Sequence, residues 1–134
     1  MIKTIELSVA SKKSIEMIDI TSEIKREVEE SRIKEGSVKV FIPHTTAGLT
    51  INENSDPFVQ KDILSALADV VPESSKFYHL EGNSDAHLKS TLFGVNVELI
   101  VHNSQLVLGN WQSVYFCEFD GPRSRKVWVQ ISGD

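Results

Sequence analysis

Alternating apolar and polar residues recur along most of the chain and predict a protein rich in β-strands. The alternation is clearest in residues 3–9, where "KTIELSV" places every second side chain on one face. Seven further runs have the composition of strands, and turn-forming residues bound them. These runs are residues 14–20, 37–43, 48–52, 95–101, 105–109, 111–119 and 125–132. The linker "ASKK" between the first two runs suggests a hairpin.

Three other segments show the periodicity and the end signals of helices. Ile20, Ile24 and Val28 recur at intervals of four, which predicts a helix with Thr21 as its N-cap and an end near Gly36. Asp56 followed by Pro57 is a strong helix start, and that helix should run to Pro72. A short helix is expected over residues 84–94, with Ser84 or Asp85 as its cap.

The order of these elements predicts an α+β fold, β-β-α-β-β-α-α-β-β-β-β. Consecutive strands joined by short turns pair antiparallel. We therefore expect one domain over residues 1–134, with a mostly antiparallel sheet or sandwich and two to three helices.

Charge and hydropathy narrow the classes of partner. The net charge is −5, which disfavours nucleic acid, because nonspecific binding needs a basic face. No apolar run is long enough to span a bilayer, so no membrane partner and a cytoplasmic location are expected. The single cysteine, Cys117, is expected to fill space in the core rather than to act as a nucleophile.

A first polar motif occupies residues 42–56, "IPHTTAGLTINENSD". His44 follows a strand-ending proline and can supply an acid–base group or a metal ligand. Thr45 and Thr46 can donate hydroxyl hydrogen bonds to an anion, and the helix start at Asp56 offers free backbone N–H groups. The alternative is a turn in which the polar residues cap their own backbone.

A second motif, "YHLEGNSDAHLKS" at residues 78–90, carries two of the four histidines. His79 and His87 lie eight residues apart across a glycine-containing loop, a spacing that matches no named zinc signature. The alternative makes His79 a surface residue and Asp85 a helix cap. Because three of the four histidines fall in these two motifs, we expect a divalent metal held by His44, His79 and His87, with zinc favoured over magnesium.

A third motif, "LGNWQSVYFCEFDGPRSRK" at residues 108–126, combines amide, carboxylate and guanidinium groups. Gln112 and Glu118 share one face of the expected strand with two apolar residues. Arg123 and Arg125 follow a tight turn, where they would either clamp a phosphate or solubilise the sheet edge.

Three segments together resemble the YjbQ family of small proteins: "HTTAGLTINENSDP", "EGNSDAHLKSTLFG" and "LGNWQSVYFCEFDGPRSRK". The resemblance covers nearly the whole chain and implies an α+β homotrimer with a secondary thiamine-phosphate synthase activity whose physiological role is unsettled. The family pattern falls on His44, Thr45, Asn52, Glu53, Asn54, Asp56, Glu81, Gly82, His87, Lys89, Gly109, Trp111, Gln112 and Glu118. The family usually has threonine where this chain has Asn110, so a contact to the ligand there would come from an amide instead of a hydroxyl.

Two functions from different classes remain open. The first is an enzyme that acts on a small phosphorylated or anionic metabolite, with weak thiamine-phosphate synthase-like transfer as the nearest described reaction. A (β/α)₈ barrel, the fold that efficient thiamine-phosphate synthases resemble, needs at least about 200 residues, so this chain cannot be one. The second is a noncatalytic homotrimer that binds a ligand or a metal.

The enzyme hypothesis assigns a role to each candidate residue. The candidate catalytic residues are His44, Glu53, Gln112 and Glu118. The candidate substrate-binding residues are Thr45, Thr46, Asn52, Asn54, Lys89, Arg123 and Arg125.

Overall fold

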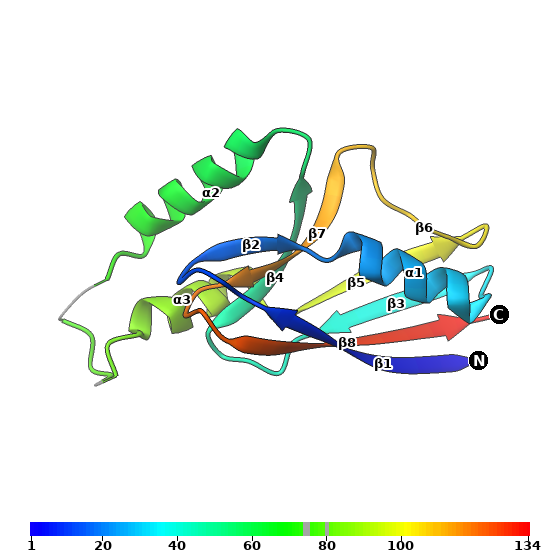
Figure 1. Ribbon diagram of the computed structural model, residues 1–134, viewed down its shortest axis with the longest axis horizontal. Helices are drawn as coiled ribbons and strands as arrows, with labels where there is room; N and C mark the ends of the chain where they lie inside the picture. The colour runs from blue at the N-terminus through cyan, green and yellow to red at the C-terminus, as the bar shows by residue number, and fades with distance from the viewer. Residues whose placement is uncertain (74–75, 80) are drawn as a thin grey trace.

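Two antiparallel sheets form the body of the protein in the computed structural model, which describes residues 1–73, 76–79 and 81–134 (Figure 1). The larger sheet has the strand order β1 (Ile2–Ala10), β8 (Ser124–Gly133), β3 (Gly36–Phe41), β5 (Asn96–His102) and β6 (Gln105–Leu106). The smaller sheet has the order β2 (Glu16–Asp19), β7 (Gln112–Glu118) and β4 (Ala47–Glu53). Every pairing between neighbouring strands is antiparallel.

Three helices complete the fold, and they occur where the sequence predicts them. They are α1 (Thr21–Ser31), α2 (Pro57–Val70) and α3 (Ser84–Phe93). The order of helices and strands matches the sequence prediction, and the α+β class is confirmed.

Strand β7 is buried on both faces, because each face packs against a different apolar cluster. Val114 and Phe116 belong to the main core, which also takes the inward side chains of β3 and β8. Tyr115 and Cys117 point to a second cluster with residues of α2 and α3. Burial raises the pKa of the Cys117 thiol to about 12, so the group stays protonated, as expected of a residue that fills space.

At three helix ends, the residue that caps the helix differs from the predicted one. Ile20, not Thr21, is the N-cap of α1, and the Thr21 hydroxyl instead accepts a hydrogen bond from the Val114 N–H at 2.8 Å. Arg32, in the left-handed conformation, ends α1 four residues before Gly36. Asn83 is the N-cap of α3, a position that was predicted for Ser84 or Asp85.

The predicted start of α2 is confirmed. The Asp56 carboxylate accepts a hydrogen bond from the Phe58 N–H at 2.9 Å, and Pro57 is the first helical residue.

The predicted hairpin between the first two strands is wrong, because β1 and β2 belong to different sheets. Ser11, directly after β1, is buried, and its N–H donates to the Arg123 carbonyl at 3.0 Å. Its hydroxyl donates to Glu118 at 2.7 Å. These contacts turn the chain away from β1 and toward the smaller sheet.

Helix α2 projects from the sheets along most of its length (Figure 1), and Gln60 near its start donates to the Tyr115 hydroxyl of β7 at 2.8 Å. Only Leu67 among its 14 residues is buried, and Phe58 and Val70 are largely exposed. None of the helices in the described part of the chain is long and apolar enough to cross a membrane.

Candidate functional site: a histidine-lined cleft

The strand pairings bring the first and third motifs to one place. Phe41, the last residue of β3, pairs with Trp128 of β8, and Ala47, the first residue of β4, pairs with Glu118 of β7. The segment 43–46 therefore runs beside the 119–123 connection between β7 and β8 and the start of β8. Helix α3 and the residues before it add a third wall, and a cleft of about 440 Å³ lies between them. Its lining comprises Pro43, His44, Thr45, Thr46, His79, Glu81, Asn83, His87, Asp120, Arg123 and Arg125.

His44 is held at the edge of the sheet by its neighbour on β8. The Lys126 N–H donates a hydrogen bond to Nε2 of His44 at 2.9 Å, so this nitrogen carries no proton and Nδ1 is the protonated one in the neutral ring. Burial, followed by the positive charge of Arg125, lowers the pKa of His44 below its ordinary value of 6.5. The imidazole is therefore neutral at pH 7 and offers its Nδ1–H as a hydrogen-bond donor, while the Lys126 N–H occupies the lone pair on Nε2.

His79 and His87 lie together on the opposite wall. Their ring centroids are 5.1 Å apart, with the edge of one ring against the face of the other. Nε2 of His79 lies 3.8 Å from a carboxylate oxygen of Glu81, whose side chain is largely exposed. The structure thus gathers three of the four histidines in one cleft, although 35 residues separate His44 from His79 in sequence.

Arg123, Asp120 and Asn83 form a hydrogen-bonded row along the cleft. Oδ2 of Asp120 accepts from Nη2 of Arg123 at 2.8 Å and from Nδ2 of Asn83 at 2.9 Å. Half of the Arg123 side chain is exposed. Oδ1 of Asn83 is buried, and no donor among the described residues reaches it. A buried acceptor without a donor favours a bound group at this point.

Arg125 borders the cleft, and its Nε and Nη2 are engaged inside the protein. Both Nε and Nη2 donate to the carboxylate of Glu118, with Nε at 2.8 Å, and Nη2 also reaches the Thr46 hydroxyl at 2.8 Å. The side chains of Arg125 and Glu118 are 4% and 0% exposed. Burial alone would raise the pKa of Glu118, but hydrogen bonds from Arg125, Ser11 and a backbone N–H hold it below its ordinary value. This ion pair ties β7 to β8 under the cleft, so Glu118 and Arg125 support the site from below.

The other end of the β4–β7 pair holds the remaining residues of the first motif. Glu53 pairs with Gln112 six positions beyond the Ala47–Glu118 pair, about 20 Å away along the strand. The Asn54 side chain bonds Asp19 and Gln60 there, and Asn52 caps the Glu53 N–H at 2.7 Å. The Asn52 contact is a backbone cap of the kind that the turn alternative describes, whereas Asn54 links the end of β4 to β2 and α2. The N-terminus of α2 follows them, so it does not contribute to the cleft as the anion hypothesis expected.

Lys89 is also absent from the cleft. Its Nζ lies 3.2 Å from Oδ2 of Asp85 one turn earlier in α3, and the Lys89 side chain is 3% exposed. A buried lysine held by its own helix is not available to a phosphate.

Comparison with known proteins identifies the relatives of this chain. A family model described as "UPF0047 protein YjbQ-like" matches residues 5–134. A UPF0047 protein of Methanocaldococcus jannaschii is 47% identical over 94% of this chain and 91% of its own length. The chain belongs to the YjbQ-like UPF0047 family. The UPF0047 protein YugU of Bacillus subtilis is 46% identical over 99% of this chain and 100% of its own length.

Solved structures of the UPF0047 family share the same fold. A Clostridium acetobutylicum protein of this family is 50% identical, with a TM-score of 0.93 over 96% of this chain and 99% of its own. A YjbQ-like Sulfolobus solfataricus protein, described as of unknown function, is 31% identical, with a TM-score of 0.96 over 100% of this chain and 99% of its own. The family resemblance drawn from the three motifs is confirmed.

Two features of this UPF0047 cleft were missed in the sequence analysis, the carboxylate of Asp120 and the ion pair between Glu118 and Arg125. The sequence carried a signal for each. Asp120 opens the turn "DGPR" after a buried strand, where a carboxylate often orders the backbone that follows. Glu118 and Arg125 sit at inward-facing positions of two strands, because Val114 and Phe116 share the face of Glu118 while Val127 and Val129 share that of Arg125. Opposite charges on two inward faces predict a buried ion pair.

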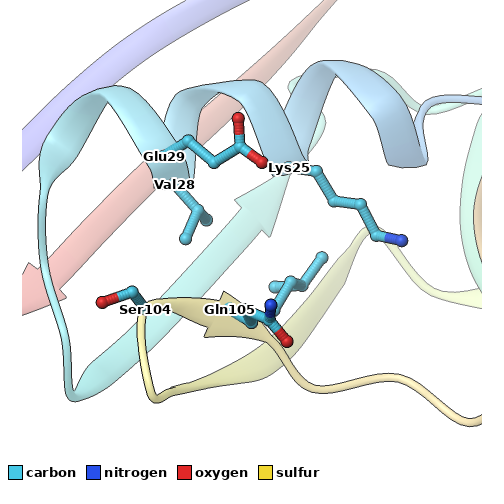
Figure 2. Close-up of a pocket in the computed structure, with 6 residues that line it drawn as sticks. Lys25, Val28, Glu29, Ser104 and Gln105 are labelled. Carbon is cyan, nitrogen blue, oxygen red and sulfur yellow. The ribbon is translucent and has the colours of Figure 1, made fainter.

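A second, smaller cavity lies at the other end of the molecule, between α1 and the β5–β6 hairpin. Figure 2 shows Lys25 and Glu29 of α1 above Ser104 and Gln105 of the hairpin. The cavity measures about 240 Å³, and each of these four polar side chains is exposed. None of the chain's histidines lines it, so the histidine-lined cleft is the better candidate site.

Proposed function

We propose that this protein binds a small phosphorylated metabolite in the histidine-lined cleft and acts on it as a weak transferase. The observation that carries the proposal is the convergence of three imidazoles, an exposed arginine, a hydroxyl and an unpartnered buried amide oxygen in one cleft of ligand size. Arg123 and the exposed Thr45 supply donors for phosphate oxygens. His44, neutral at pH 7, offers its Nδ1–H as a further donor, and its Nε2 can take up a proton once the Lys126 N–H releases it.

The charge balance of the cleft supports a role for a divalent metal. Asp120 already neutralises Arg123, Glu118 neutralises Arg125, and Glu81 adds a further negative charge. An anion would be repelled by this surplus unless a bound cation compensates it. The donor types present, three imidazoles with a nearby carboxylate, are those that zinc accepts.

The histidines do not form a ready coordination shell in the geometry observed. No set of three His, Cys, Asp or Glu side chains within residues 1–73, 76–79 and 81–134 is close enough to hold a metal ion. Nε2 of His44 is also occupied by the Lys126 N–H. Because Nδ1 of His44 carries the ring proton, binding through His44, His79 and His87 would require the Lys126 N–H to release Nε2. It would also require the two rings on the opposite wall to turn toward it.

The nearest described reaction is thiamine-phosphate synthesis, in which a diphosphate leaves and a thiazole phosphate is alkylated. Of the four candidate catalytic residues, only His44 lines the cleft, while Glu118 lies buried beneath it. Such a site can bind and neutralise a leaving phosphate, but it offers few groups for proton transfer. This favours weak transfer over efficient catalysis.

Binding of pyrophosphate tests the proposal. Pyrophosphate should raise the melting temperature of the wild type by mass action, and the rise should be larger with Zn²⁺ or Mg²⁺ than with chelator. Thr45→Val and Arg123→Gln should each shrink the rise and leave the ligand-free melting temperature nearly unchanged, since both side chains are exposed.

A neighbouring cation outside the cleft provides the control. Lys126 pairs with Glu6 at 3.4 Å on the sheet surface, so Lys126→Gln removes the same charge as Arg123→Gln and should preserve the pyrophosphate effect. An equal loss in all variants would mean that the anion responds to general surface charge, which would contradict the proposal.

The alternative function is a noncatalytic metal- or ligand-binding homotrimer, and the gathering of His44, His79 and His87 favours it specifically. Elemental analysis of protein purified without chelator should then find stoichiometric metal that His87→Ala removes. Stoichiometric metal without turnover of any phosphorylated metabolite in a broad screen would select this alternative over the transferase.

A further inference from the structure

An apolar groove adjoins the polar cleft and shares part of its wall. The groove measures about 630 Å³ and lies between the end of β3 and helix α3. Four residues line both spaces, so the cleft and the groove meet at Pro43, His44, Thr45 and His87. The two imidazoles therefore stand on the border between a polar and an apolar compartment.

The chemistry of the groove differs from that of the cleft. Beyond the shared border its walls are Phe41, Ile42 and Val95 on one side and Ser90, Thr91 and Gly94 on the other. None of the described residues that line it is an Asp, Glu, Lys or Arg. Phe41 is 46% exposed, and a Cβ built at Gly94 would meet no atom within 4 Å, so the groove is open to a ligand.

We infer that the ligand of this site is an organic phosphate with an uncharged apolar or aromatic group, which lies in the groove while the phosphate occupies the cleft. The inference rests on the proposed phosphate site and specifies its substrate class. Continuity through four shared residues allows one molecule to fill both spaces. The bond between the two parts of the ligand then passes His44 and His87, and Phe41 selects for the apolar group.

The burial of a ring against Phe41 and Val95 has a measurable consequence. Apolar area removed from water contributes to affinity in proportion to its size, and a phenyl group is far larger than a methyl group. Phenyl phosphate should therefore bind at least about tenfold more tightly than methyl phosphate, because the phosphate contacts are the same for both.

Calorimetric titration of the full chain with inorganic phosphate, methyl phosphate and phenyl phosphate tests the inference, under whichever metal condition gives the larger pyrophosphate effect. Phe41→Ala should reduce the advantage of phenyl over methyl phosphate to less than about threefold while methyl phosphate binding stays unchanged. Thr91→Trp, on the opposite and exposed wall, should fill the groove and produce the same loss without disturbing the core.

The control is Ile100→Ala, which removes an exposed apolar side chain from the same sheet outside the groove. It should keep the full phenyl advantage. Equal affinities for phenyl and methyl phosphate in the wild type, or an advantage that survives both groove variants, would overturn the inference while the phosphate site stands. Failure of the wild type to bind any of the three phosphates would overturn the proposed function and this inference with it.

Discussion

The buried pair of Glu118 and Arg125 is the residue-scale feature on which the site most depends. It closes the space between β7 and β8, and Arg125 also holds the hydroxyl of Thr46, a residue that lines the cleft. Glu118→Gln leaves the guanidinium buried without its counter-charge, so we expect unfolding free energy to fall by about 3–5 kcal/mol. Urea denaturation measures the loss.

An exposed pair supplies the matched control for this substitution. Glu6→Gln breaks the contact with Lys126 on the surface, where such pairs contribute at most about 1 kcal/mol. Similar losses in Glu118→Gln and Glu6→Gln would show that the buried pair has no special role.

His44 makes the stability of the protein depend on pH. Its pKa in the folded protein is lowered below 6.5, so the unfolded chain takes up the proton first as the pH falls. The stability that this group contributes is fully present above pH 6.5 and is lost as the pH falls through the lowered pKa. We expect His44→Gln to lose less stability than the wild type between pH 7.5 and 5.5, as urea midpoints would show. An identical loss in both proteins would rule out His44 as the source.

The residues also show where sequence reasoning reaches its limit. His44, Thr45 and Arg123 were singled out because each belongs to a polar run that follows the end of a strand. The structure places all three in one cleft. Glu53 and Gln112 carry the same local signal but lie at the far end of β4 and β7. Spacing along the chain could not separate the two groups, because strand register decides which end of a strand each residue reaches.

At the scale of elements, hydrophobic periodicity predicted the helices and strands well and their partners less well. The pattern in β7, with Val114 and Phe116 on one face and Cys117 on the other, was recovered in the two core clusters. The predicted β1–β2 hairpin is not formed, because hydrogen bonds from Ser11 to Glu118 of β7 and to Arg123 of the β7–β8 connection decide that turn. Long-range contacts of this kind leave no periodic signal in sequence.

Helix α2 should open independently of the rest of the molecule. Its Asp56 cap is intact, but only Leu67 is buried, so little tertiary packing stabilises the helix. Asp56→Ala removes a cap that contributes about 0.5–2 kcal/mol to the helix. We expect faster amide exchange within α2 and almost no change in the exchange of β3 and β8.

Ser55→Ala, at the adjacent exposed position, should leave amide exchange in α2 unchanged. If Asp56→Ala accelerates exchange throughout the sheets, α2 is instead part of the cooperative core.

At the scale of the whole molecule, the exposed surface is large for the mass. A compact monomer of this size exposes about 7,000 Å², whereas this chain exposes 8091 Å². Phe58, Val70 and Leu92 are among its exposed apolar side chains. We expect association into a homotrimer, which sedimentation at micromolar concentration would detect. A single monomeric species there would contradict this expectation.

The most direct test is to determine which residues bind phosphate. In a two-dimensional NMR titration with pyrophosphate, we expect the imidazole signals of His44 and His87 and the amide signals of Thr45 and Asn83 to shift together, with one saturable affinity. The amides of Lys25 and Ser104, at the cavity of Figure 2, should stay in place. Shifts centred on that second cavity, or shifts in the cleft that grow linearly without saturation, would contradict a ligand site among the histidines.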